Sequence, residues 1–445
     1  MDTESHYQSA LDYLYSFIDY SLKHASELAK ADFNLDRMRA LMAELGNPQD
    51  AYPLIHVAGT KGKGSVSALC AAALRAAGYK TGLYTSPHLQ DFCERIQVDG
   101  QPISHADLAA LVDEIKPAVA RVPKLTTFEL TTALGFLYFA RQNATVAVIE
   151  VGLGGRLDAT NIVTPCVSVI TSLSYDHTAV LGDTLTLIAG EKAGIIKPGI
   201  PVVSAPQNEE ALTVLEKVAA ERECKFILVG RDLTYQMVSQ SLESQTFNLQ
   251  PSTFSHLTLT IPLLGAYQAE NATVAYTALK VGFNLADQAI KDGFANVRWP
   301  GRFEIAQKEN PIVIFDSAHN QDSFEKLAAT LEAYFPGRKA TLVFGVSEDK
   351  HLTAMLKAMQ PLLARVIATR ADHPRALEPE QIVEAAMQLG VEAEAAAPVE
   401  TALKRALDFS QKDGSIVISA GSLFVTAEAS LAWQWIGRSE NNRTD

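Results

Sequence analysis

The chain has 445 residues, of which 47% are hydrophobic and 20% are charged, and its formal net charge is −13. This length predicts two or three domains with an ample hydrophobic core. The acidic balance excludes broad binding to nucleic acid or to anionic membrane surfaces, so any anionic ligand must be held by local positive features.

Cysteine usage and the apolar segments predict the compartment. The 4 cysteines are scattered and form no C-x-x-C pair, which is typical of reduced thiols in a cytoplasm. The first residues lack a basic stretch followed by an apolar one, and no apolar run is long enough to span a bilayer. We therefore expect a cytoplasmic protein that does not enter the membrane.

Helices are predicted first at residues 6–18 and 35–45, where apolar residues recur at helical spacing. Gly46 and Pro48 end the second of these helices. A polar connection that includes residues 30–34 joins the two helices ahead of the first predicted strand.

A glycine-rich turn, GTKGKGS at residues 59–65, follows an apolar strand at 54–58 and precedes an alanine-rich helix. Such a turn can hold a phosphate, because glycines let backbone N–H groups converge and the helix N-terminus adds partial positive charge. We expect Lys63 to reach phosphate oxygens and Ser65 to reach a phosphate-bound Mg²⁺. Val57 replaces the first glycine of G-x-x-x-x-G-K-[ST] and one residue separates Lys63 from Ser65, so the turn is a variant phosphate loop. A lysine-rich surface turn is the alternative.

The strands predicted at 81–84, 145–151 and 166–171 each end close to a polar side chain that could bind a ligand. These side chains are Ser86, Glu150 and His177. A glutamate near the end of a buried strand is costly unless it is paired or bound to metal. Ser86 could equally be a turn serine, and a lone histidine is more often structural than a ligand.

The helix predicted at 184–195 carries Lys192, which the pattern alone indicates to be a solvated lysine. Residues 152–157 do not form the dinucleotide motif G-x-G-x-x-G, because Leu157 occupies the place of the third glycine. A strand, a helix and a strand follow over 201–229, and alternating residues over 233–262 predict a small antiparallel patch.

The clearest domain boundary is Trp299-Pro300-Gly301, which divides the chain into residues 1–298 and 299–445. Beyond it, strands alternate with helices in a second α/β unit of ordinary domain size. These strands are predicted at 311–316, 341–346, 365–369 and 415–420. Asp316 and His319 fall in the turn after the first of them, a common place for ligand binding, although an Asn/Asp helix cap is the alternative.

Several segments taken together resemble the folylpolyglutamate synthase and dihydrofolate synthase family, which is related to the Mur ligases. They are GTKGKGS (59–65), YTSPHL (84–89), LTTFE (125–129), EVGLGGRLDATNI (150–162), DHT (176–178), GEKAGI (190–195), PGRFE (300–304) and FDSAHN (315–320). They occur in the family's order over nearly the whole chain, and the combination is highly specific. One departure is Lys61, where many members carry Asn.

The resemblance implies an α/β protein with an N-terminal P-loop NTPase-like domain on a parallel sheet and a C-terminal Rossmann-like domain, with ATP and substrates between them. It implies a monomeric ATP-dependent ligase that adds L-glutamate to dihydropteroate, to tetrahydrofolate polyglutamates, or to both, through an acyl phosphate. Folylpolyglutamate synthase activity alone, a Mur-type ligase that uses a UDP-muramoyl acceptor, and a P-loop regulatory ATPase are the alternatives.

The resemblance also implies roles for individual residues. ATP would be bound by Gly59, Thr60, Lys61, Gly62, Lys63, Gly64, Ser65, Asn271, Arg302 and Asp316. Two Mg²⁺ ions would be bound by Ser65, Ser86, Glu150, His177 and Lys192, the last of which is carbamylated in relatives. The pterin and glutamate sites would include Asp32, Phe33, Thr127, Phe128, Leu157, Asp158, Ala159, His319 and Ser422. The catalytic residues would be Lys63, Glu150, His177 and Lys192.

Overall fold

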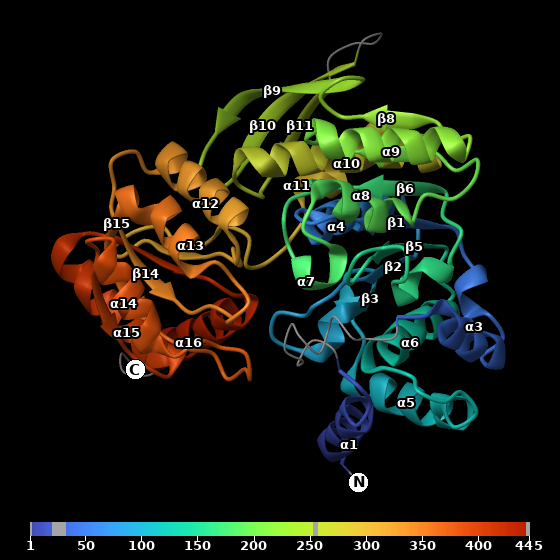
Figure 1. Ribbon diagram of the computed structural model, residues 1–445, viewed down its shortest axis with the longest axis horizontal. Coiled ribbons are helices and arrows are strands. Elements are labelled where there is room, and N and C mark those ends of the chain that lie inside the picture. Colours follow the sequence, from blue (N-terminus) through green and yellow to red (C-terminus); the bar gives the residue numbers. More distant parts are fainter. Residues whose placement is uncertain (1, 20–32, 252–256, 442–445) are drawn as a thin grey trace. The chain divides into compact units, whose positions relative to one another are not determined.

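The structure is a computed structural model, and it describes residues 2–19, 33–251 and 257–441. The chain divides into two compact units. The first comprises Met1–Ser239, Thr246–Pro262 and Gln268–Val297. The second comprises Gln240–Gln245, Leu263–Tyr267 and Arg298–Asp445, most of which is orange to red in Figure 1.

The first unit is built on an 8-stranded sheet with the order β4-β3-β2-β5-β1-β6-β7-β8. Its strands are β1 (Leu54–Ala58), β2 (Thr81–Tyr84), β3 (Ile96–Val98), β4 (Gln101–Pro102), β5 (Val146–Glu150), β6 (Val167–Ile170), β7 (Val202–Ser204) and β8 (Phe226–Leu228). Neighbours from β2 to β8 run parallel, whereas β3 and β4 are antiparallel additions at one edge. The central strands are buried along their whole length, which explains their continuous apolar sequences.

The helices predicted at 6–18, 35–45 and 184–195, after the glycine-rich turn and within 201–229 are all present in the first unit, together with further helices. They are α1 (Thr3–Tyr15), α3 (Leu35–Glu44), α4 (Lys63–Ala76), α5 (His105–Val119), α6 (Thr127–Arg141), α7 (Thr178–Leu181), α8 (Leu185–Ala193), α9 (Glu209–Glu221), α10 (Ala266–Phe283, in this unit from Gln268) and α11 (Asp287–Ala295). Short 3-10 helices are η2 (Pro48–Asp50), η3 (Phe92–Arg95) and η4 (Ala159–Ile162). Among the described residues, every helix is too short or too polar to cross a membrane.

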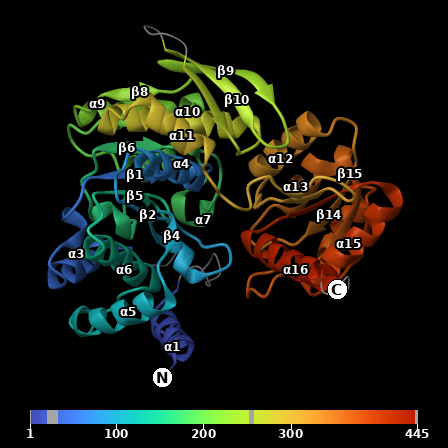
Figure 2. The same ribbon diagram turned by 180° about the vertical axis from the view of Figure 1, so that it is seen from behind.

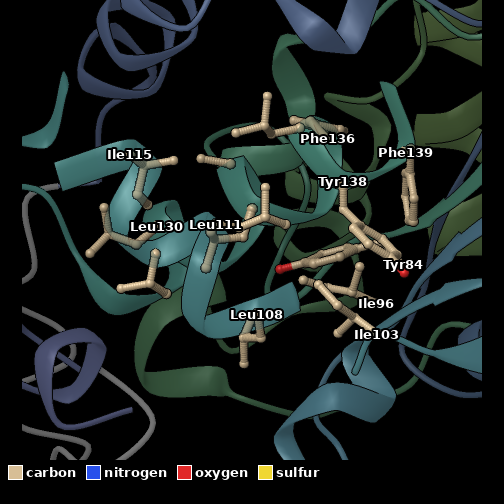
Figure 3. Packing of buried hydrophobic residues seen from close by; sticks show 14 of the residues in the cluster. Tyr84, Ile96, Ile103, Leu108, Leu111, Ile115, Leu130, Phe136, Tyr138 and Phe139 are labelled. Atoms are coloured by element: carbon tan, nitrogen blue, oxygen red, sulfur yellow. The ribbon is translucent and has the colours of Figure 1, made fainter. Parts of the chain in front are cut away.

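A large hydrophobic core of the first unit lies between its sheet and helices α5 and α6. Leu108 and Leu111 of α5 pack toward Leu130 and Phe136 of α6, next to Tyr84 of β2 (Figure 3). Helix α6 begins with a capping box, in which the Thr126 hydroxyl accepts from the Glu129 amide and Glu129 accepts from the Thr126 amide. The core and this cap together fix where α6 begins.

A separate 3-stranded sheet, with the order β11-β10-β9, occupies the region in which a small patch was predicted. Its strands are β9 (Leu233–Gln240), β10 (Gln245–Pro251) and β11 (Leu257–Ile261).

The second unit contains a 6-stranded sheet with the order β12-β13-β17-β14-β15-β16. The strands are β12 (Glu304–Gln307), β13 (Val313–Phe315), β14 (Ala340–Phe344), β15 (Leu363–Ala368), β16 (Glu392–Ala395) and β17 (Ile416–Ala420). The helices are α12 (Gln321–Tyr334), α13 (Leu352–Met359), η5 (Gln360–Leu362), α14 (Pro379–Gln388), α15 (Val399–Asp413) and α16 (Leu423–Asn441). All neighbours are parallel except β12 with β13.

Both faces of this second sheet are covered by helices, as the two packing clusters show (Figure 2). One cluster joins the sheet to α12, α13 and α14, and the other joins it to α15 and α16. The predicted α/β class, with a parallel-sheet first unit and a separate α/β second unit, is confirmed.

Candidate active site

The carboxyl ends of neighbouring parallel strands lie together at one edge of the first sheet. The register pairs Val57 of β1 with Glu150 of β5, and Ala58 of β1 with Ile170 of β6. The glycine-rich turn that follows β1 therefore begins at the same edge as Glu150 and as the segment after β6. This is the edge at which α/β sheets place ligands.

The glycine-rich turn lies so close to neighbouring side chains that there is no room for a side chain at Gly59 or Gly62. A Cβ on Gly59 would lie 1.8 Å from Thr171 Oγ1, and one on Gly62 would lie 2.2 Å from Asn271 Oδ1. Gly62 also has a φ of 90° and precedes α4 without a side-chain cap. The first-turn amides of α4 thus keep the geometry of an anion-binding helix N-terminus, and Asn271 of α10 lies directly beside it.

Lys61 is paired within the same edge. Its Nζ atom lies 3.1 Å from Asp176 Oδ2, and the two side chains are 14% and 7% exposed. The amides of Thr60 and Lys61 both donate to Ser172 O at 3.0 Å. The charge of Lys61 is therefore balanced by Asp176, and the pair joins the turn to the segment after β6.

The predicted metal ligands lie at or after the ends of the neighbouring strands. Glu150 ends β5 and is only 5% exposed, and the Ser86 amide donates to its Oε2 at 3.4 Å. His177 has a φ of 50°, and its amide donates to Asp176 Oδ1 at 3.0 Å. Ser65 is buried in the first turn of α4. The carboxylate and the two hydroxyl groups are oxygen donors of the kind that Mg²⁺ prefers, so these residues fit the ion.

Lys192 is buried. The prediction of a solvated lysine from the sequence pattern was therefore wrong. Lys192 lies on α8 with 4% exposure, and its Nζ atom is 3.4 Å from Gly154 O. Burial is the main cause that lowers the pKa of Lys192 to about 7, and the nearby charge of Lys63 lowers it further, while Asp176 opposes the shift. A large fraction of this side chain is therefore a neutral amine near neutral pH.

Of the residues expected at the pterin site, Leu157, Asp158 and Ala159 lie on the loop after β5, and Phe128 lies beside its first residue, Gly152. The Phe128 ring lies so close to Gly152 that a Cβ there would be 2.4 Å from its Cζ atom. Leu157 is half-buried on the loop, and Ala159 packs into the core. The Thr127 hydroxyl is engaged, since it donates to Leu14 O at 3.0 Å. Phe33 is half-buried, and Asp32 lies outside the described residues.

Asp158 is a buried carboxylate on this loop. Through Thr160 it is linked to His56, a residue that the sequence patterns did not single out. Asp158 accepts from the Gly152, Leu153 and Thr160 amides at 2.9–3.0 Å and from Thr160 Oγ1 at 2.5 Å. Burial raises the pKa of Asp158, while these hydrogen bonds oppose the rise. Thr160 Oγ1 is in turn 2.9 Å from His56 Nε2. The only sequence signal for His56 was a histidine in an otherwise apolar strand.

The second unit brings its own predicted residues to the carboxyl edge of its sheet. Asp316 follows β13 and is buried, where its carboxylate accepts from the Phe303 amide at 2.7 Å and from the Ala318 amide at 2.8 Å. Burial raises the pKa of Asp316, and the charge of Arg302 opposes this. Ser422 follows the adjacent β17, and its hydroxyl accepts from the Val425 amide at 3.1 Å.

His319 lies in the turn between β13 and α12. Its Nδ1 atom is 2.8 Å from Ser317 O, and the side chain is half-buried. The next residue, Asn320, is the N-cap of α12 and accepts from the Ser323 amide at 3.0 Å. The turn thus contains the helix cap that was the alternative interpretation, and the cap holds His319 at this edge.

Comparison with known proteins agrees with this architecture. Residues 57–279 match the Mur ligase middle domain, and residues 301–423 match the Mur ligase glutamate ligase domain. With its glycine-rich turn on a parallel sheet and its separate α/β unit, the chain belongs to the Mur ligase family.

The more specific family follows from individual relatives. The chain is 36% identical over 382 residues to the dihydrofolate synthase/folylpolyglutamate synthase of Bacillus subtilis, covering 83% of this chain and 86% of that protein. The folylpolyglutamate synthase of Mycobacterium tuberculosis complexed with ADP has a TM-score of 0.88 at 33% identity, covering 97% of this chain and 98% of that one. Escherichia coli FolC in complex with DHPP and ADP has a TM-score of 0.84 at 30% identity, covering 99% and 98%. The chain belongs to the dihydrofolate synthase/folylpolyglutamate synthase family.

Proposed function

We propose that this protein is an ATP-dependent amide ligase of folate metabolism, which joins L-glutamate to dihydropteroate, to tetrahydrofolate polyglutamates, or to both. One observation carries the proposal: an uncapped helix N-terminus, with Lys63 and the buried Lys192 near each other, lies at the sheet edge where Glu150 ends β5. Relatives with the same two units bind ADP, and one binds ADP together with DHPP.

The chemistry requires charge neutralisation and positioning more than a protein nucleophile. A carboxylate does not condense with an amine at neutral pH, so transfer of the γ-phosphoryl group of ATP to the acceptor carboxylate first gives an acyl phosphate. The neutral glutamate amine then attacks the acyl carbon and forms the N–C bond, its nitrogen loses a proton, and phosphate leaves with the C–O bond electrons. Lys63 and the first-turn amides of α4 hold the phosphate oxygens and orient them for in-line transfer.

Ser65, Ser86, Glu150 and His177, together with Lys192 in a carbamylated form, would hold two Mg²⁺ ions. When bound, Mg²⁺ supplies further neutralisation of the charge on the triphosphate. Glu150 would contribute a buried carboxylate. Lys192 would contribute only after reaction of its neutral amine with CO₂, which forms an N–C bond, releases a proton and leaves a carbamate anion. Its lowered pKa and its proximity to Lys63 both favour that anion.

The two units would bind different substrates. We assign residues 1–298 to ATP and the pterin acceptor, with the acceptor next to Phe33, Phe128 and the loop that carries Asp158. Residues 299–445 would bind glutamate near His319 and Ser422 and would contact ATP through Arg302 and Asp316. A cytoplasmic monomer belongs to the same proposal.

Product formation with defined acceptors tests this function. Purified protein is incubated with MgATP, L-glutamate and either dihydropteroate or tetrahydrofolate, and ADP, phosphate and the glutamylated pterin are measured. Product with dihydropteroate shows dihydrofolate synthase activity, and product with tetrahydrofolate alone shows a folylpolyglutamate synthase. No product with either pterin would reject the proposal. Turnover with a UDP-muramoyl acceptor would then indicate a Mur-type ligase, and ATP hydrolysis stimulated only by a protein would indicate a regulatory ATPase.

A further inference from the structure

His56 is a fully buried histidine on β1, and the proposed mechanism gives it no role. It lies three positions before Gly59, on the strand that leads into the glycine-rich turn. Its Nε2 atom is 2.9 Å from Thr160 Oγ1, which belongs to η4 on the loop after β5. His56 therefore connects the strand before the phosphate turn with the loop of the proposed acceptor site.

The direction of each hydrogen bond in this connection follows from the donors present. Asp158 receives 4 hydrogen bonds, from the amides of Gly152, Leu153 and Thr160 and from the Thr160 hydroxyl. An ionised carboxylate can only accept, so the single hydroxyl proton of Thr160 is donated to Asp158. The Thr160 oxygen must then accept its other bond from the Nε2–H group of His56.

The environment of His56 agrees with a neutral ring that carries its proton on Nε2. Burial, with a smaller contribution from the charge of Lys197, lowers the pKa of His56 to about 3. Among the described residues, Nδ1 of His56 has no hydrogen-bond partner. The ring thus donates its single N–H group to Thr160 Oγ1.

The consequence is a loop whose shape depends on the Asp158 carboxylate. A carboxylate has about four acceptor positions, and the loop itself supplies a donor for each of them. The Asp158 carboxylate therefore points toward its own loop, where it accepts hydrogen bonds from the amides of Gly152 and Leu153 directly after β5. Gly152 supports the Phe128 ring, and Leu157 lies on the same loop.

We propose that His56 is a positioning residue, which acts through Thr160 to hold the Asp158 carboxylate toward its loop and so shapes the wall of the pterin-acceptor site. It touches neither substrate nor nucleotide in this role. The inference rests on the proposed function, because the acceptor site is assigned there. It predicts that loss of the His56 donor weakens acceptor binding selectively, although His56 lies on the nucleotide strand.

Matched substitutions separate the hydrogen bond from the volume of the side chain. His56→Gln can place an amide N–H near the position of Nε2, whereas His56→Asn and His56→Leu cannot. Thr160→Ser keeps the hydroxyl, and Thr160→Val removes it at nearly constant volume. KM and kcat are measured for the pterin acceptor, ATP and glutamate separately, together with the thermal unfolding midpoint of each variant.

We expect His56→Leu, His56→Asn and Thr160→Val to raise the KM for the pterin by about tenfold, as the loss of one buried hydrogen bond implies. The KM for ATP should change by less than about twofold, and His56→Gln and Thr160→Ser should stay close to wild type. The double variant His56→Leu/Thr160→Val should be little worse than Thr160→Val alone, because both changes break one chain of hydrogen bonds.

Other patterns would overturn the inference. Equal increases in the KM for ATP and for the pterin, or equal defects in His56→Gln and His56→Asn, would show that the Nε2 donor has no positioning role. A lowered unfolding midpoint with unchanged KM for the pterin would show a role in stability alone. If His56→Leu fails to fold, the Gln and Asn pair decides the question. If the wild-type protein turns over a pterin but the variants show no selective increase in the KM for it, only the role of His56 is refuted. If the wild-type protein turns over no pterin, the proposed function and this inference are refuted together.

Discussion

Because Lys192 is buried, the free energy of unfolding should depend on pH. Replacing Lys192 with Met should remove this dependence. The pKa of Lys192 is about 7, against an ordinary value of 10.5. At about 1.36 kcal/mol per pKa unit, the charged form below pH 7 costs the folded state about 5 kcal/mol. Between pH 7 and 10.5 the unfolded chain binds more protons than the folded one, so the free energy of unfolding should rise by about 1.4 kcal/mol per pH unit.

Lys192→Met replaces the ammonium with an apolar side chain of similar length and should abolish this contribution. We expect the variant to be more stable than wild type at pH 7, by up to about 5 kcal/mol, and to have a correspondingly flatter slope between pH 7 and 10. Urea unfolding at several pH values in buffer depleted of CO₂ measures both quantities. Lys217→Met is the control, since that side chain is 73% exposed on α9, and it should leave the slope unchanged.

The same variant should lose ligase activity, because the removed group lies beside Lys63 at the proposed phosphate site. A more stable protein with little activity would show that Lys192 is retained for function at a cost in stability. Equal pH slopes for wild type and Lys192→Met would refute the reasoning, since they would mean that Lys192 does not titrate as a buried amine.

Further predictions concern the phosphate turn, the metal and the fold. Lys63→Ala should lower kcat by at least about a hundredfold, because it removes charge compensation at the phosphates; ADP release measures this, and near-normal kcat would contradict the role. Removal of divalent ions with EDTA should stop product formation, and added Mg²⁺ should restore it; full activity without the ion would exclude the proposed metal site. Thr126→Ala should lower the free energy of unfolding by about 1 kcal/mol through loss of the α6 cap, whereas Thr126→Ser should change it by less. Equal urea midpoints for these two variants would show that the cap does not stabilise α6.

The central strands of the two large sheets were predictable, whereas the edge strands β4, β12 and β16 were not. The central strands β1, β5 and β6 are buried on both faces and therefore have continuous apolar sequences. By contrast, β16 reads Glu-Ala-Glu-Ala, and β12 pairs antiparallel at the opposite edge. Edge strands take their conformation from pairing with a neighbour, so their own residues carry little apolar signal.

The sequence by itself determined the order of the central strands, the glycine-rich turn before α4, and the polar residues that follow the predicted strands. These are local properties, since a run of apolar residues or a glycine before a helix constrains its own backbone. Only the tertiary structure decided that Lys192 is buried near Lys63, that Lys61 pairs with Asp176, and that His56 reaches Asp158 through Thr160. Each of these depends on packing between segments far apart in the chain, and packing decides which charges lose their water and which donors find an acceptor.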